Sequence, residues 1–241
     1  MYNELNLRDL GGLPFADGTG AVPRQLFLRS GKLSQLSAEQ CRKLCESRHI
    51  RCVIDLRTPV EAAEFPDPLP PGVDYRQIPL LKDATVGITH ETGSDPMAIL
   101  RNLRRHPEKL KAMLPDFKAL YLQTVTDPCS RAQLQRVVDL LRANAQRGIC
   151  TLFHCTAGKD RTGIVSMALL KSYGVSHADI VRDYLRTNRH ALLPTLRKCI
   201  AVGLLTRSGA LMKAAYGALM ANREWIELAL EHYDPLPLGN Q

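Results

Sequence analysis

The 241-residue sequence has no apolar run that approaches the length of a membrane span. Its most apolar stretch, 210–220, is interrupted by Lys213, whereas a transmembrane helix needs about 20 mostly apolar residues. The first residues also lack the basic-then-apolar pattern of a secretory signal. We therefore expect no membrane span, and a protein that is either cytoplasmic or exported to act in a host cell.

The cysteines indicate neither a disulfide framework nor a zinc site. There are seven of them, an odd number, and no Cys-x-x-Cys pair occurs. Cys41 and Cys45 lie four residues apart on an expected helix, but no pair of histidines at ligand spacing accompanies them. We expect mostly buried, reduced thiols and no metal or other cofactor.

The charges lack any block of five or six residues of one sign, which argues against a nucleic-acid-binding tail. Lys and Arg number 32 and Asp and Glu 24, so the net charge is +8, a surplus that suits an anionic substrate or surface. The hydrophobic share of 45% is ordinary for a chain that buries a core. We expect one domain over residues 1–241 and no nucleic-acid partner.

The order of expected elements predicts an α/β domain with helices on both faces of a sheet. Capping boxes at Ser37 and Ser130 predict two helix starts, and Gly148 is well placed to end the second of these helices. Residues 82–128 differ, because prolines break them into short helical pieces, and we interpret them as a helical insertion that either covers the site or packs on the core. The chain is expected to be mostly helical over 191–234. The expected strands are 25–29, 51–56, 73–80 and 149–153, and the other expected helices are 59–64 and 162–173.

The residues that follow the last expected strand carry the chemistry: His154-Cys-Thr-Ala-Gly-Lys-Asp-Arg-Thr-Gly163. A strand, a tight loop of small residues and a helix start together suit an oxyanion, because loop N–H groups converge and the helix N-terminus adds a positive dipole. A nucleotide-binding P-loop would need glycine at Phe153 and a hydroxyl at Asp160. The string therefore predicts an anion-binding loop of another kind.

This loop places Cys155 six positions before Arg161. The thiolate is the nucleophilic form of cysteine, and loop amides, a helix start and a nearby cation all favour it. The planar fork of Arg161 can hold two phosphate oxygens, and the Thr162 hydroxyl can stabilise the thiolate. We predict phosphoryl transfer to Cys155, followed by hydrolysis of the phosphocysteine. The expected phosphate-binding residues are Thr156, Ala157, Gly158, Lys159, Asp160, Arg161 and Thr162.

The Cys-x5-Arg spacing is not specific by itself, since Cys45 and Arg51 share it. Between those two residues lie bulky side chains and no glycine, so we interpret that match as chance. The 154–163 string adds His before the cysteine, Gly-Lys-Asp before the arginine and Thr-Gly after it. These additions make the string a strong signal.

The string resembles the signature loop of the cysteine-based protein tyrosine phosphatase superfamily, in particular its atypical, mostly microbial branch, which is related to dual-specificity and phosphoinositide phosphatases. Three further segments resemble that branch: Asn6-Leu-Arg-Asp-Leu-Gly-Gly12, Ile54-Asp-Leu-Arg57 followed by Glu61, and Asp183-Tyr-Leu-Arg-Thr-Asn188. The resemblance implies a central, mainly parallel sheet flanked by helices and metal-independent hydrolysis of phosphomonoesters. The first expectation is a phosphotyrosine protein as substrate. The alternatives are a phosphoinositide or dual-specificity phosphatase and, less favoured because Cys155 and Arg161 are both present, a non-catalytic phospho-binding module.

Two carboxyls compete for the role of general acid, which must protonate the leaving group and later activate water. The resemblance favours Asp160, which lies inside the loop. Asp83 is the alternative, because dual-specificity relatives carry the acid on a mobile loop after the strand that corresponds to 73–80. We interpret Asp55, Asp116 and Asp127 as strand-end and helix-cap residues.

Two loop neighbours have supporting roles. His154 is expected to orient the loop by a hydrogen bond to backbone, because a strand residue next to the nucleophile points to the opposite face. Lys159 could bind a second phosphate, as on a phosphoinositide, or balance the charge of Asp160. A basic cluster could extend the site towards anionic lipid, although a solvated helix face is the simpler interpretation: Arg101, Arg104, Arg105, Lys109 and Lys111.

Overall fold

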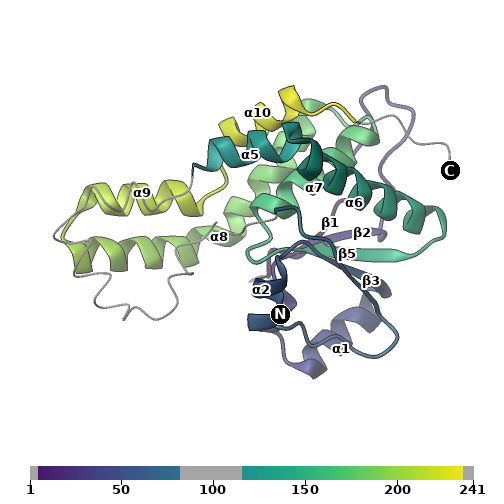
Figure 1. Ribbon diagram of the computed structural model, residues 1–241, viewed down its shortest axis with the longest axis horizontal. Coiled ribbons are helices and arrows are strands. Elements are labelled where there is room, and N and C mark those ends of the chain that lie inside the picture. Colours follow the sequence, from purple (N-terminus) through teal and green to yellow (C-terminus); the bar gives the residue numbers. More distant parts are fainter. Residues whose placement is uncertain (1–4, 82–115, 236–241) are drawn as a thin grey trace.

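The fold is built on one five-stranded sheet, seen in a computed structural model that describes residues 5–81 and 116–235 (Figure 1). The strands lie in the order β1-β2-β5-β3-β4. Strand β1 is antiparallel to β2, and all other neighbours are parallel. The predicted α/β class with a mainly parallel sheet is therefore confirmed. The strands are β1 (Arg8–Asp9), β2 (Phe27–Ser30), β3 (Ile50–Asp55), β4 (Asp74–Gln77) and β5 (Cys150–His154).

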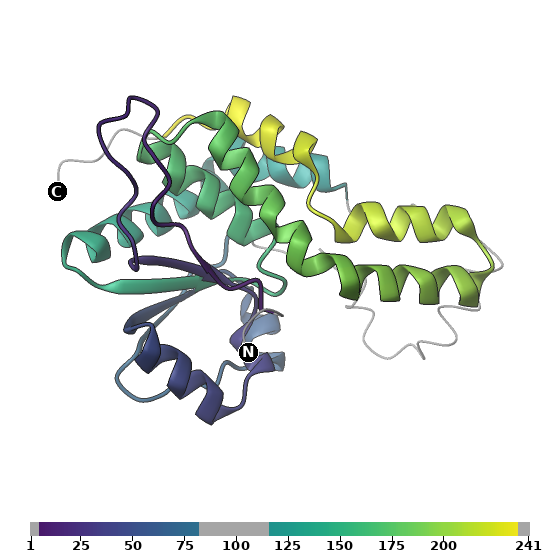
Figure 2. The ribbon, with the colours of Figure 1, turned by 180° about the vertical axis from the view of Figure 1, so that it is seen from behind.

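Helices cover both faces of this sheet, as the views from the front and from behind show (Figures 1 and 2). Helix α1 lies on one face, whereas α6 and α7 lie on the other, where α5, α8 and α10 add a further layer. The helices are α1 (Ala38–Ser47), α2 (Pro59–Glu64), α5 (Phe117–Thr126), α6 (Pro128–Gln146), α7 (Asp160–Ser172), α8 (His177–Thr206), α9 (Gly209–Leu219) and α10 (Arg223–His232), with a short 3-10 helix, η2 (Leu33–Gln35).

The alternation of side chains along the strands builds a hydrophobic cluster on each face of the sheet. Val53 of β3 packs on the α1 side with Leu44. The next residue, Ile54, belongs to the larger cluster on the opposite side, together with Phe153 of β5 and the inner faces of α6 and α7. The sheet is therefore buried on both faces, which is typical of parallel strands.

Helix starts were predicted correctly at one capping box and wrongly at the other. Ser37 caps α1, where its side chain accepts from the backbone N–H of Gln40. Ser130 does not cap a helix: Asp127 caps α6 by accepting from the N–H of Ser130, and Pro128 takes the first helical position. Asp116 caps α5, so Asp116 and Asp127 are the helix-cap residues that the sequence indicated.

All seven cysteines lie in the described part of the chain as free thiols, and all but Cys129 are buried. Among the described helices, none is long and apolar enough to cross a membrane. The predicted helical pieces between 96 and 113, the basic cluster between Arg101 and Lys111, and Asp83 lie outside the described residues.

Candidate active site

The signature loop lies at the carboxyl edge of the parallel strands. Strand β5 ends at His154 and α7 begins at Asp160, so the residues from Cys155 to Lys159 form the turn between them. His154 is in register with Ser30 of β2 and Asp55 of β3, the last residues of the two neighbouring strands. Ligands bind at this edge in open parallel sheets. Cys155 is buried, with 3% of its surface exposed.

Arg161 stands in the first turn of α7 and is held by Glu61 of α2. The two Nη atoms of Arg161 lie 2.6 and 2.7 Å from the two carboxylate oxygens of Glu61, which is a bidentate pair. Thr156 of the loop donates to the same carboxylate at 2.7 Å. Burial opposes ionisation, but the hydrogen bonds and charge of Arg161 bring the pKa of Glu61 down to about 2. Glu61 thus fixes the guanidinium and the loop together.

Replacement of Glu61 by glutamine is expected to destabilise the fold by about 3 kcal/mol at neutral pH, since its pKa falls from an ordinary 4.5 to about 2 on folding. A lowered folded-state pKa contributes stability above the unfolded-state pKa and loses it as the pH falls towards 2. The difference between wild type and Glu61→Gln should therefore shrink at about pH 3. Urea unfolding of wild type and Glu61→Gln, at neutral pH and at about pH 3, measures this difference in the free energy of unfolding.

Glu39 offers the matched control, because its pKa is also lowered to about 2 by hydrogen bonds from Arg42, but its side chain is 54% exposed. Glu39→Gln should cost far less, since solvent screens an exposed pair. An equal cost for the two variants, or a Glu61→Gln cost that does not change with pH, would contradict this role.

Asp160 lies at the start of α7 and is contacted by a buried tyrosine from outside the loop. The hydroxyl of Tyr121 in α5 donates to Asp160 Oδ1 at 2.7 Å and lies 2.8 Å from the hydroxyl of Tyr184. Burial, followed by the charge of Asp160, raises the pKa of Tyr121 well above its usual value, so this hydroxyl stays protonated as a donor. Sequence reasoning missed both tyrosines.

Lys159 directs its ammonium away from solvent. Its Nζ donates to the carbonyl oxygen of Ala218 at the end of α9 (2.7 Å) and lies 3.5 Å from Asp160 Oδ2. The rings of Phe117 and Trp225 lie 5.2 and 5.7 Å away. Only 7% of the Lys159 side chain is exposed, an arrangement that favours the balance of the Asp160 charge over contact with a second phosphate, and both roles stay predictions.

The back of the loop is tied to the N-terminal segment at a single carbonyl. The oxygen of Gly158 accepts from Asn6 Nδ2 at 2.8 Å and from Arg29 Nη2 at 3.0 Å. Gly158 has a φ of +66°, and a Cβ there would lie 2.5 Å from the oxygen of Ser30. Only glycine fits this close approach.

Behind that contact, a buried ion-pair cluster joins two segments of the resemblance. Arg8 pairs with Asp183 at 2.9 Å, and Arg29 reaches the other oxygen of that carboxylate at 3.1 Å. Burial opposes ionisation, but Arg29 and Arg8 lower the pKa of Asp183. The segments 6–12 and 183–188 thus meet beneath the loop and support it.

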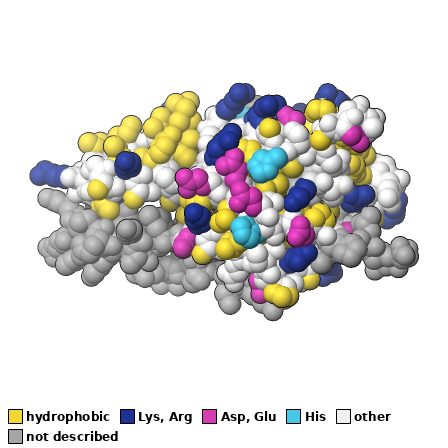
Figure 3. Space-filling model, turned by 90° about the horizontal axis from the view of Figure 1, so that it is seen from above, with side chains coloured by type: hydrophobic (Ala, Val, Ile, Leu, Met, Phe, Trp, Pro, Cys, Tyr) yellow, Lys and Arg dark blue, Asp and Glu magenta, His cyan; other side chains and the backbone are white. Residues whose placement is uncertain are grey.

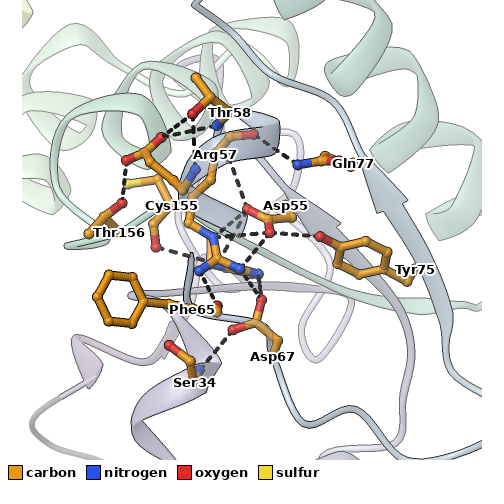
Figure 4. A network of polar contacts seen from close by, with 12 residues as sticks. Ser34, Asp55, Arg57, Thr58, Phe65, Asp67, Tyr75, Gln77, Cys155 and Thr156 are labelled. Carbon is orange, nitrogen blue, oxygen red and sulfur yellow. Dashed lines mark hydrogen bonds and ion pairs between the residues drawn. The ribbon is translucent and has the colours of Figure 1, made fainter. Parts of the chain in front are cut away.

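A second polar cluster supports the loop from the neighbouring strand (Figure 4). Arg57 Nη2 lies 2.7 Å from Asp55 Oδ2 and 2.6 Å from Asp67 Oδ2, and Tyr75 donates to Asp55 at 2.8 Å. His154 is fully buried, with Nε2 3.2 Å from Asp67 Oδ2 and Nδ1 3.3 Å from the oxygen of Cys155. Asp55, Asp67 and His154 are close enough to hold a cation, but the guanidinium of Arg57 already binds both carboxylates.

The other residues predicted for the site lie in the loop, in the first turn of α7 or outside the described residues. Thr156 and Thr162 belong to the loop and the first turn of α7, and the fully buried hydroxyl of Thr162 makes no hydrogen bond with the residues that the structure describes. Ala157 is in the loop, and Asp83 lies outside the described residues. The second Cys-x5-Arg pair is not a site: Cys45 is buried in α1, and Arg51 is exposed on β3.

A buried cysteine and an arginine held by a carboxylate, on one loop between a strand and a helix, are the features of a cysteine-dependent phosphatase. The sequence model of the tyrosine phosphatase family matches residues 2–235, and the chain belongs to that family. Proteins with assigned names are also similar to this chain in sequence. A tyrosine-protein phosphatase of Nostoc commune is 32% identical over 166 residues, which cover 68% of this chain and 49% of that protein.

Two other relatives align over more of the chain. A Cupriavidus necator protein with a provisional tyrosine-protein phosphatase name is 31% identical over 76% of this chain and 60% of its own length. The triple specificity protein phosphatase PtpB of Mycobacterium tuberculosis is 32% identical over 81% of this chain and 70% of its own length. The chain thus spans about half of the Nostoc relative and three fifths of the Cupriavidus relative.

Proposed function

We propose that this protein hydrolyses phosphotyrosine in proteins, without a metal, through a phosphocysteine on Cys155. The observation that carries the proposal is the bidentate Arg161–Glu61 pair, which fixes a guanidinium six residues after a buried cysteine on a strand–helix loop. Membership of the tyrosine phosphatase family supports it, as does the similarity to the Nostoc and Cupriavidus proteins, which are named as tyrosine-protein phosphatases.

In the first step the thiolate of Cys155 attacks phosphorus, the S–P bond forms, and the bond from phosphorus to the tyrosine oxygen breaks. Asp160 gives a proton to that oxygen as it leaves. Each Nη of Arg161 gives one N–H to Glu61, so the Nε–H and a remaining Nη N–H are the donors that bind two non-bridging oxygens and stabilise their charge in the transition state. The buried Thr162 hydroxyl, which has no described partner, is available to donate to the sulfur.

In the second step water attacks the phosphocysteine, Asp160 accepts a proton from that water, and the thiolate leaves with its electron pair. Inorganic phosphate is released, and the enzyme returns to its starting state. The Tyr121 hydroxyl holds one oxygen of Asp160, and Lys159 lies near the other, so both contacts orient the carboxyl at the head of α7.

The assignment of the acid predicts a leaving-group effect. Asp160→Asn should slow aryl and alkyl phosphates with poor leaving groups much more than those with good leaving groups, because only the former need protonation, and general acids contribute about 100- to 10,000-fold. The measurement is kcat/KM across a series of substituted phenyl phosphates. Asp83→Asn is the matched variant and should show a flatter dependence; the opposite ranking would transfer the role to Asp83.

A broader specificity is the second candidate, as a phosphoinositide or dual-specificity phosphatase. Its specific support is the similarity to a relative named a triple specificity protein phosphatase, together with the net charge of +8. Contact with anionic lipid belongs to the same candidate. A place in the cytoplasm, or in a host cell after export, stays a prediction.

The test of the proposed function is phosphate release from a phosphotyrosine peptide, a phosphoserine peptide and soluble short-chain phosphoinositides, measured side by side with EDTA present. We expect the phosphotyrosine peptide to have the highest kcat/KM and EDTA to have no effect. Loss of activity in EDTA, or a phosphoinositide as the far better substrate, would overturn the proposal.

A further inference from the structure

The second half of α8 and the whole of α9 form a helical hairpin that extends from the body of the molecule (Figures 1 and 2). We refer to residues 190–219 as the α8–α9 hairpin. Most large hydrophobic side chains that are exposed in the described part of the protein lie on it; the exceptions are Val60, Phe65 and Tyr75. Those on the hairpin are Leu192, Leu193, Leu196, Ile200, Leu204, Leu205, Met212 and Tyr216.

The apolar side chains of α8 form a continuous stripe. Leu193, Leu196, Ile200 and Leu204 recur at intervals of three and four residues, which places them on one face of the helix. Their exposure is large, reaching 68% for Leu193 and 75% for Leu204. The buried positions in this half of α8 are different ones, Thr195, Cys199 and Thr206, and Met212 of α9 packs against Gly203. The stripe therefore lies outside the packing that holds the hairpin together.

The charge of this region has one sign only. No aspartate or glutamate occurs between Asp183 and Glu224. Exposed cations stand along this stretch, and none of them makes an ion pair with a described carboxylate: Arg186, Arg189, Arg197, Arg207 and Lys213. Figure 3 shows hydrophobic side chains gathered over the hairpin end of the molecule, with Lys and Arg beside them and no described Asp or Glu at the outer end of that face.

We propose that the α8–α9 hairpin docks on the surface of a bilayer that contains anionic phospholipids. A helix with an apolar face and flanking cations lies in the interface with its apolar side chains among the headgroups, and its cations bind the negative surface. An acidic protein segment without apolar side chains would match the cations but would leave the exposed leucine stripe in water. Lipid satisfies both features at once.

Docking at this place would bring the active site to the membrane. The Lys159 ammonium, one residue before Asp160, donates to the carbonyl oxygen of Ala218 in the last turn of α9. The base of the hairpin is therefore fixed to the signature loop, so a docked hairpin holds the loop near phosphorylated groups at the bilayer surface. Binding itself needs no turnover, and it can be measured whether or not the proposed function is correct.

The experiment is co-sedimentation of the full chain with vesicles of phosphatidylcholine mixed with phosphatidylserine, and with vesicles of phosphatidylcholine alone. We expect binding to the mixed vesicles that weakens as salt is raised. Leu193→Asn combined with Leu204→Asn should weaken the partition coefficient at least about tenfold, because a polar amide replaces each inserted side chain. Arg197→Gln combined with Lys213→Gln should weaken it about fivefold or more per cation.

A matched control removes the same charge elsewhere. Arg136→Gln combined with Arg147→Gln, on the exposed surface and C-terminal end of α6, should leave binding within about twofold of wild type. Turnover of a small soluble aryl phosphate and near-ultraviolet circular dichroism check that each variant is folded.

The proposal fails if wild type does not bind the mixed vesicles, or if folded hairpin variants bind as well as wild type. It also fails if the control pair reduces binding as much as Arg197→Gln with Lys213→Gln, because net charge alone would then explain the affinity. A wild-type dimer in sedimentation velocity that Leu193→Asn with Leu204→Asn converts to monomer would assign the stripe to a second copy of the chain instead.

Discussion

Cys155→Ser is expected to lower kcat for a phosphotyrosine peptide by at least about a thousandfold, because a serine hydroxyl is a far weaker nucleophile than a thiolate at neutral pH. The buried position of Cys155 and the anchored guanidinium of Arg161 remain, so the variant should still bind phosphate or vanadate. Steady-state kinetics and calorimetric titration with the oxyanion measure the two effects separately.

Cys129→Ser provides the matched control, since Cys129 is an exposed thiol in the first turn of α6. It should turn over within about twofold of wild type. Substantial activity in Cys155→Ser, or an equal loss in Cys129→Ser, would contradict the assignment of the nucleophile.

Arg161→Lys should have the second largest effect. A lysine ammonium is a point charge that cannot reproduce the planar fork, neither towards two phosphate oxygens nor towards the two oxygens of Glu61. We expect kcat/KM to fall about a thousandfold, the size that an arginine reaches in other phosphoryl transfers. Arg182→Lys, with a side chain that is 74% exposed, is the control and should change little. Activity of Arg161→Lys within about tenfold of wild type would show that charge alone suffices.

The signature loop could be predicted because its structure is local. A buried strand, small residues and a helix start follow one another within 149–163, so the sequence places Cys155 after a strand and Arg161 in the first helical turn. The resemblance also selected two segments that meet behind the loop, where Arg8 pairs with Asp183 and Asn6 donates to the carbonyl of Gly158.

The residues that orient the catalytic groups could not be predicted, because packing brings them together from distant parts of the chain. Glu61 meets Arg161 across 100 positions, and Tyr121 meets Asp160 across 39. Glu61 lay within a resembling segment but had no predicted role, although a buried acid at the third position of a capping box is a usable signal. Nothing in the sequence marked Tyr121 as a partner of the loop.

Local competition explains the wrong helix start. Ser130 and Asp127 are both good N-caps, and the pattern Ser130-Arg-Ala-Gln133 favoured the former. In the structure α5 ends at Thr126, so Asp127 closes one helix and caps the next. The position of α5 is set by tertiary contacts, in which Phe117 stacks on Trp225 of α10 with ring centroids 4.9 Å apart.

The central claim is a covalent phosphocysteine, and the most direct measurement is to trap it. Wild-type protein is mixed with a phosphotyrosine peptide that carries radiolabelled phosphate, quenched in acid at successive times during turnover, digested and mapped. We predict label on the peptide that contains Cys155, bound as an S-phosphate ester and lost when unlabelled substrate is added before the quench. Label on any other residue, or a burst of released tyrosine peptide with no label on Cys155 at any time, would contradict the mechanism.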